Sequence, residues 1–224
     1  MDELWTVELH SHTEYSRDSR TALETVIETC RVKGIDRIAI TDHNTANGAL
    51  KLQQMAPELV IVGEEIMTTE GEILAFFVKE TIPAKLTPNE TIRRLRDQGA
   101  VISVSHPYDR FRKGAWEEDQ LLRIVDQVDA LEVFNSRCLI PEDNLKALLF
   151  AQKYGKLGTV GSDAHIPYEL GHAVLKMRPF VSPEEFLISL RTVVPVTTLS
   201  PFWVHGFSSI AKWQRKYLGI PQPS

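Results

Sequence analysis

The sequence contains few cysteines, since Cys30 and Cys138 are the only two among 224 residues. Cys30 lies in a predicted helix, and Cys138 follows a predicted strand. The first residues also lack the basic-then-apolar pattern of a secretion signal. We therefore expect two free thiols in a reducing cytosol rather than a disulfide, and a cytoplasmic protein.

Long apolar runs and an excess of positive charge are also missing. No apolar run reaches about 18 residues, so we expect no membrane-spanning helix. The chain has 25 lysines and arginines against 30 aspartates and glutamates, a net charge of -5. Sequence-independent phosphate binding needs a basic face, so we expect no stable binding of duplex nucleic acid. A phosphorylated substrate can still bind if metal ions supply positive charge locally.

The remaining composition suits one α/β domain, which we expect to span residues 1–224. Hydrophobic residues make up 43% and charged residues 25% of the chain, which is ordinary for a globular protein. Strand patterns alternate with helix patterns over the first two-thirds of the sequence. The expected strands are 5–9, 35–40, 59–62, 72–78, 100–104, 130–134, 157–160, 173–177 and 193–199. The expected helices are 21–33, 46–55, 87–98, 116–125, 141–154 and 183–191.

This alternation predicts a parallel sheet with helices outside it. Polar side chains cluster just after the predicted strands, and the ends of the strands of a closed (β/α) barrel converge on one mouth. An open doubly wound sheet also places sites at strand ends, but it is less able to bring ligands from six or seven strands to one point. We therefore favour a barrel.

The first strand ends in His10-Ser11-His12. Side chains alternate along a strand, so both imidazoles point the same way, about 7 Å apart along the strand. Two imidazoles on one face can hold a metal ion, although a pair of surface or core histidines is the more common arrangement. Further ligands at other strand ends would decide between the two.

Further candidate ligands do follow other strands, and five of the seven histidines are among them. The set comprises His10, His12, Asp18, Asp42, His43, Glu64, Glu65, His106, Asn135, Asp163 and His165. Nitrogen and carboxylate ligands without cysteine suit Zn²⁺, Mn²⁺ or Fe²⁺. The ligands exceed the needs of one ion, so we expect two or three metals, which typically activate water in phosphoryl transfer.

Five ordered motifs in this chain resemble those of the PHP (polymerase and histidinol phosphatase) superfamily. They are His10-Ser11-His12-Thr13, Thr41-Asp42-His43, Gly63-Glu64-Glu65, Ser105-His106-Pro107 and Gly161-Ser162-Asp163-Ala164-His165. The resemblance covers about residues 5–175, and residues 176–224 would add final barrel elements and an aromatic tail. It implies a distorted (β/α)7 barrel, a di- or trinuclear metal site and phosphoesterase activity. Small stand-alone phosphoesterases that act on nucleoside phosphates or trim oligonucleotides are the most similar members.

The resemblance also implies roles for individual residues. His10, His12, Glu65 and Asp163 would hold a first metal, and Glu65 would bridge to a second metal held by His106. Asp18, His43 and His165 would hold a third. Some relatives carry another histidine near residues 72–76 and a stronger ligand at position 135, so Glu72, Asn135 or water would complete the second metal here. Asp42 and Glu64 are expected to point away from the metals.

Substrate contacts are expected from basic residues near the mouth. We assign Arg17, Arg110 and Arg137 to the substrate phosphate, and Arg112 and Lys113 lie in the same basic loop as Arg110. Asp163 and His165 are the catalytic candidates. The aromatic tail 202–217 is expected to pack on the barrel exterior or on a partner subunit.

The sequence thus predicts an enzyme that hydrolyses a small phosphate ester, such as a nucleotide, a short oligonucleotide phosphate or another phosphomonoester. A histidinol-phosphate-type phosphatase is the alternative within this chemistry. A metal-binding barrel of weak activity, or one that hydrolyses another bond as amidohydrolase-like barrels do, also remains open. Those barrels commonly use a bridging lysine, for which Lys79 and Lys85 are poorly placed.

Overall fold

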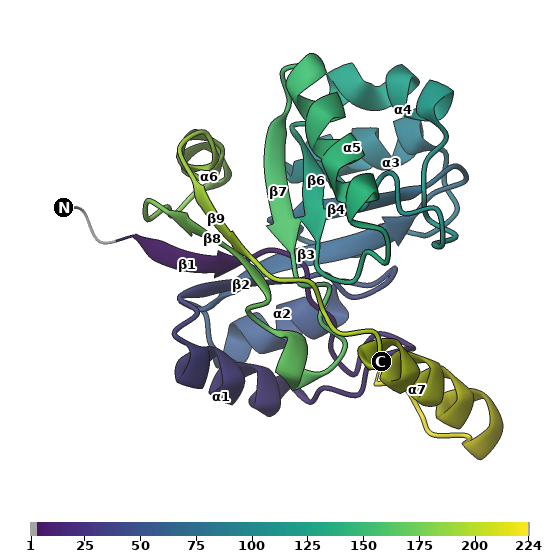
Figure 1. The fold of residues 1–224 in the computed structure, drawn as a ribbon. Coiled ribbons are helices and arrows are strands. Elements are labelled where there is room, and N and C mark those ends of the chain that lie inside the picture. Colours follow the sequence, from purple (N-terminus) through teal and green to yellow (C-terminus); the bar gives the residue numbers. More distant parts are fainter. Residues whose placement is uncertain (1–3, 224) are drawn as a thin grey trace.

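The computed structural model describes residues 4–223. Nine strands in this range form one sheet in the order β7-β6-β5-β4-β3-β2-β1-β8-β9 (Figure 1). Their bounds are β1 Trp5–Glu8, β2 Arg37–Ile40, β3 Val60–Met67, β4 Glu72–Phe76, β5 Val101–Val104, β6 Ala130–Asn135, β7 Leu157–Gly161, β8 Ala173–Met177 and β9 Val194–Thr197. All nine expected strands are therefore present. Most agree within a few residues at their ends, but β3 continues five residues past its expected end and includes Glu64 and Glu65.

Strands β1 to β7 curl into a nearly closed barrel. β1, β2 and β3 are parallel, β5, β6 and β7 are parallel, and β4 runs antiparallel between the two groups. The barrel closes just beyond the strand ends, where Ser11 pairs with Ala164 and His12 N donates to Ala164 O at 2.9 Å. Closer to its start, β1 pairs instead with β8, so β7 and β1 separate there. The expected distorted barrel is confirmed. Strands β4 and β8 run opposite to the other strands, and β9 pairs antiparallel with β8.

Helices α1 to α6 follow the predicted alternation, and α7 forms in the tail, where no helix was expected. Their bounds are α1 Leu23–Lys33, α2 Asn47–Met55, α3 Pro88–Gln98, α4 Glu118–Ile124, α5 Pro141–Lys153, α6 Pro183–Leu190 and α7 Val204–Leu218. Thr87 caps α3 by accepting from Glu90 N at 3.3 Å, and Gly99 ends it in the left-handed conformation. None of the helices within residues 4–223 combines the length and hydrophobicity needed to cross a bilayer.

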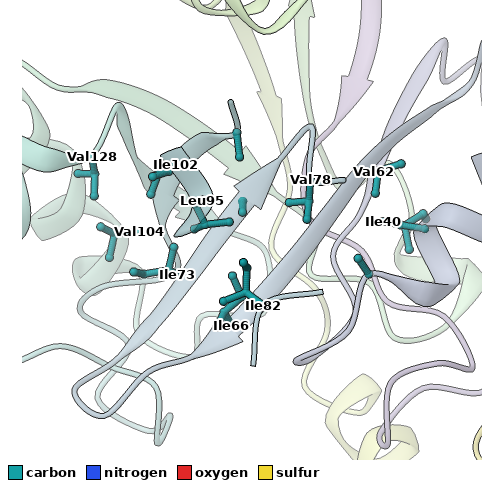
Figure 2. Packing of buried hydrophobic residues seen from close by; sticks show 14 of the residues in the cluster. Ile40, Val62, Ile66, Ile73, Val78, Ile82, Leu95, Ile102, Val104 and Val128 are labelled. Atoms are coloured by element: carbon teal, nitrogen blue, oxygen red, sulfur yellow. The ribbon is translucent and has the colours of Figure 1, made fainter. Parts of the chain in front are cut away.

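Two apolar clusters hold these elements together. The outer cluster lies between the sheet and the surrounding helices, where Ile66 and Ile73 of the β3–β4 hairpin pack near Leu95 of α3 (Figure 2). The inner cluster fills the barrel interior and includes Phe76 and Phe186. Phe186 belongs to α6, so this helix closes the end of the barrel where β1 and β7 separate.

The inward face of several strands changes from apolar to polar along its length. On β3, Ile61 packs in the inner cluster, and Glu65 lies on the same face four residues later. On β4, Phe76 packs inside, and Glu72 lies at the other end of the strand. Because β4 is antiparallel, its first residue rather than its last lies at the mouth of the barrel. The residues of β3 and β4 that point into the barrel are thus apolar in its interior, which we call the apolar floor, and acidic at its open end, which we call the mouth.

We expect both thiols to react slowly in the folded protein. Cys30 and Cys138 are buried and unpaired, as predicted. Burial raises the pKa of Cys30 to about 12 and that of Cys138 to about 11, which leaves little thiolate at neutral pH. Titration with a chromogenic disulfide reagent should find two thiols per chain only after unfolding. Rapid reaction of the native chain would contradict this, and Cys30→Ser and Cys138→Ser variants would identify the thiol.

Candidate metal centre

His10 and His12 converge with two carboxylates immediately after β1. Their Nε2 atoms lie 3.2 Å apart, and both side chains are fully buried. His12 Nε2 lies 3.1 Å from Asp163 Oδ1, and His10 Nε2 lies 3.4 Å from Glu65 Oε1. The structure therefore brings together the four residues assigned to the first metal.

Glu65 connects this group to two further sets of side chains. Its Oε1 lies 3.0 Å from His106 Nε2, and its Oε2 lies 2.9 Å from His43 Nδ1. Glu72 approaches the same two imidazoles, at 3.5 Å from His106 Nε2 and 3.8 Å from His43 Nδ1. Glu65 thus occupies a bridging position, and Glu72 lies where the expected second metal lacked a ligand.

Asp18, His43 and His165 form the third set. Asp18 Oδ2 lies 3.3 Å from His43 Nε2, and Asp18 Oδ1 lies 3.5 Å from His165 Nε2. The ring of His12 also lies 4.4 Å from those of both His43 and His165, between centroids. The eight predicted metal ligands thus surround one small volume at the mouth of the barrel.

The donor chemistry of this volume fits divalent metal ions. Three groups at this site have ligand atoms within 4.8 Å of one another, namely His12-His43-His165, His10-His12-Asp163 and His43-Glu65-Glu72. The buried Oδ1 of Asp18 has no hydrogen-bond partner among residues 4–223. Imidazole nitrogens facing carboxylate oxygens suit Mn²⁺, Zn²⁺ or Fe²⁺.

Glu132 holds the first ligands in place from behind, a role that the sequence analysis missed. Its Oε1 lies 2.8 Å from His10 Nδ1, and its Oε2 accepts from His106 N at 2.8 Å and from Asn135 Nδ2 at 3.1 Å. Such contacts fix the orientation of a metal-binding imidazole. The available signal was a single charge inside the apolar strand Ala130–Phe134.

Two other carboxylates point away from the ligands, as expected. Asp42 accepts from Thr13 N at 2.7 Å and from Ser16 Oγ at 2.7 Å, which holds the loop after β1. Ser16 Oγ in turn lies 3.1 Å from His12 Nδ1. Glu64 lies on the opposite face of β3 from Glu65 and accepts from Ile82 N at 2.9 Å. Asp42 thus supports His12 through Ser16 and the loop backbone, and Glu64 holds the backbone at Ile82.

The buried charges shift the pKa values of the ligands in different directions. Burial opposes protonation of His10, but the carboxylates of Glu132 and Glu65 outweigh it and hold the pKa of His10 well above its ordinary value. Burial and nearby Arg137 lower the pKa of His165 to about 3. His165 is therefore a neutral imidazole at neutral pH, with a lone pair available to a metal.

Backbone geometry at two ligands depends on uncommon conformations. His106 and Asp163 have φ angles of 22° and 53°, in the left-handed region that most residues avoid. Gly161, two residues before Asp163, leaves space for a neighbouring strand. A Cβ there would overlap His10 Cβ and lie 2.6 Å from Glu132 Oε1. Glycine is therefore required where β7 passes His10.

A cavity of about 880 Å³ opens above the ligands. Arg17 and Arg137 line it, as do Arg112 and Lys113. Arg110 does not belong to this lining, and its Nη2 instead lies 2.6 Å from Asp143 Oδ1. Arg112 takes the position nearest the ligands, because it pairs with both Asp163 and Asp109.

The aromatic tail was expected to pack on the barrel exterior or on a partner subunit, but part of it lines the cavity instead. Residues 204–218 form α7, and one side of this helix lines the cavity. Lys212 Nζ lies 3.0 Å from Asp18 Oδ2, and Arg137 Nη2 donates to Ser208 Oγ at 2.8 Å. Figure 1 shows α7 beside the loop that follows β1. The aromatic side chains Trp203 and Trp213 remain about half exposed.

Comparisons with known proteins agree with this geometry. The family model for the PHP domain matches residues 8–159, and a PHP-associated model matches residues 141–192. Uncharacterized protein MJ0417 of Methanocaldococcus jannaschii is 38% identical over 195 residues, 83% of this chain and 78% of that protein.

Two solved structures share the fold at low sequence identity. One is a two-domain protein of Bacteroides vulgatus containing a predicted PHP-like metal-dependent phosphoesterase, with a TM-score of 0.69 and 16% identity. The match covers 87% of our chain and 65% of the Bacteroides vulgatus protein. The other is PsfC of Pseudomonas syringae, with a TM-score of 0.67 and 18% identity over 97% of this chain and all of that one.

Replacing Glu132 should weaken metal binding without removing a ligand. In Glu132→Gln, one end of the side chain becomes an NH2 donor. It faces either His10 Nδ1 or the donors His106 N and Asn135 Nδ2, so the three contacts of Glu132 cannot all be kept and His10 is held less firmly. Loss of such a partner typically lowers metal affinity about 10–100-fold. Calorimetric titration of the metal-free protein with Mn²⁺ or Zn²⁺ measures the change.

Glu142→Gln is the matched control, because Glu142 is exposed on α5. It should bind metal as the wild type does. Equal affinities of Glu132→Gln and the wild type, with unchanged circular dichroism, would show that Glu132 does not orient His10.

Proposed function

Because the chain belongs to the PHP family, we propose that it is a metal-dependent phosphoesterase that hydrolyses a small phosphate ester. The observation that carries the proposal is the convergence of His10, His12, Glu65 and Asp163 with further ligands in one buried volume. Seven carboxylate and imidazole contacts of 3.6 Å or less join His10, His12 and Glu65 to their neighbours. Ligands so closely arranged can hold two or three ions.

Bound divalent metals would supply an acidified water and neutralise charge on the phosphate oxygens. The chain would hold them through the eight predicted ligands, His10, His12, Asp18, His43, Glu65, His106, Asp163 and His165. Glu65 bridges two sets of ligands, and Glu72 replaces the further histidine that some relatives carry. We assign Asp163 and His165 to the reacting centre, because both face His12 across the closed edge of the barrel.

Positively charged side chains would orient the scissile phosphate. Arg112 reaches Asp163, and Arg137 is buried with its Nε 3.3 Å from Glu169 Oε1. Both line the cavity, so their remaining donors can contact a phosphate beside the metals. Arg17 lines the same cavity and is exposed. Arg112 thus takes the place that the sequence analysis gave to Arg110.

The size of the cavity favours a nucleotide or the end of a short oligonucleotide over a phosphate ester of a few atoms. A volume of about 880 Å³ is within the range of pockets that bury organic ligands. A histidinol-phosphate-type substrate remains the second candidate. Hydrolysis through a bridging lysine is disfavoured, because Lys79 lines a separate cavity and Lys85 is exposed on a loop.

Replacing His10 should abolish hydrolysis. The substitution His10→Ala removes an imidazole that lies within 3.6 Å of Glu65 and Asp163, and we expect at least about a thousandfold loss of kcat/KM. Phosphate release is measured on a panel of nucleoside and other phosphomonoesters with added Mn²⁺, alongside the bound metal content. Chelator should remove the wild-type activity, and metal should restore it.

His172→Ala provides the control, because His172 bonds Ser200 Oγ at 3.0 Å outside the ligand set. It should retain activity. Wild-type activity in chelator-treated, metal-free protein, or in His10→Ala, would exclude a metal-dependent phosphoesterase.

A further inference from the structure

We propose that α7 is a substrate-recognition element whose Lys212 binds a second anionic group of the substrate, separate from the scissile phosphate. The proposal rests on the proposed phosphoesterase function and adds the substrate class. Substrates would be phosphate esters that carry another phosphate or carboxylate a few bonds away. The evidence is the placement of cations in the cavity and the way in which α7 is attached.

The cations of the cavity form two separate tiers. The inner tier is Arg112 and Arg137, which pair with the buried carboxylates of Asp163 and Glu169. The outer tier comprises Arg17, Lys113, Lys212 and Lys216, which line the same cavity and are exposed. One phosphate beside the metals can use the inner tier, so the outer tier is available to a different negative group.

Lys212 is the member of the outer tier that points toward the ligands. Its Nζ lies 3.0 Å from Asp18 Oδ2, and its side chain is half exposed. If Asp18 binds metal, its charge is shared with the ion, and the ammonium group of Lys212 can turn to a substrate anion. Lys216 lies one helical turn farther along α7, so the two ammonium groups follow one path out of the cavity.

Polar contacts rather than a large apolar interface attach α7 to the barrel. Arg215 Nη2 donates to Glu14 O at 2.7 Å and to Ser19 O at 3.0 Å, and Arg20 donates to Gln214 Oε1 at 2.7 Å. The buried residues of α7 are small or short, namely Val204, Ser208 and Ala211. These contacts fix the basic side of α7 over the loop that carries Asp18, so the helix is oriented to read a charged group.

A pair of non-hydrolysable probes tests this inference. Calorimetry on the metal-loaded protein compares propane-1,3-bisphosphonate, which has a second anionic group, with propylphosphonate, which has none. Lys212→Met should weaken bisphosphonate binding about tenfold and propylphosphonate binding less than about twofold, because one charge-assisted contact is lost. Lys212→Arg should restore most of the difference. Lys51→Met removes an exposed charge of α2 and should change neither affinity.

The outcomes separate this inference from the proposed function. Equal losses for both probes, or no loss for the bisphosphonate, would overturn the role of Lys212. Metal content measured on each variant shows whether a loss arises through Asp18 instead, which would also overturn it. Absence of turnover on every phosphomonoester would overturn the proposed phosphoesterase function, whereas turnover with an unchanged affinity ratio would overturn the inference alone.

Discussion

The site depends on how the buried negative charge of Glu65 is compensated. This carboxylate is fully buried, and an isolated buried carboxylate would be costly. It is tolerated because imidazoles of His10, His43 and His106 surround it, so that burial is outweighed and its pKa stays well below the ordinary value. Each of these histidines follows a different strand. The charge balance therefore holds only when several strands are assembled in register.

The register of the sheet makes this assembly possible. Alternation along β3 and β4 places Ile61 and Phe76 in the barrel interior and Glu65 and Glu72 at its mouth. A shift of one residue would turn both the apolar floor and the ligand of each strand to its outer face. Packing of the core and geometry of the site are thus specified by the same pattern, and neither can change alone.

The sequence predicted the barrel and the position of its site because each ligand motif follows a strand, as His10-Ser11-His12 does. Contacts made across the barrel could not be predicted in the same way. The contact between Glu132 and His10 joins residues 122 positions apart in the sequence. It can be recognised only when the folded barrel brings β6 near the end of β1. The contact between the tail and the site could not be predicted either. The aromatic residues of the tail, such as Trp203 and Trp213, suggested only packing on the exterior or on a partner, whereas Lys212 of α7 reaches Asp18.

The pairing of Ser11 with Ala164 has a consequence for the whole molecule. This bridge is the seam of the barrel, and predicted ligands flank it on both sides, with His12 on one and Asp163 on the other. An ion bound by both residues would link the two edges of the barrel that meet at this bridge. Metal affinity and barrel closure would then be thermodynamically linked, so that binding energy contributes directly to the stability of the fold.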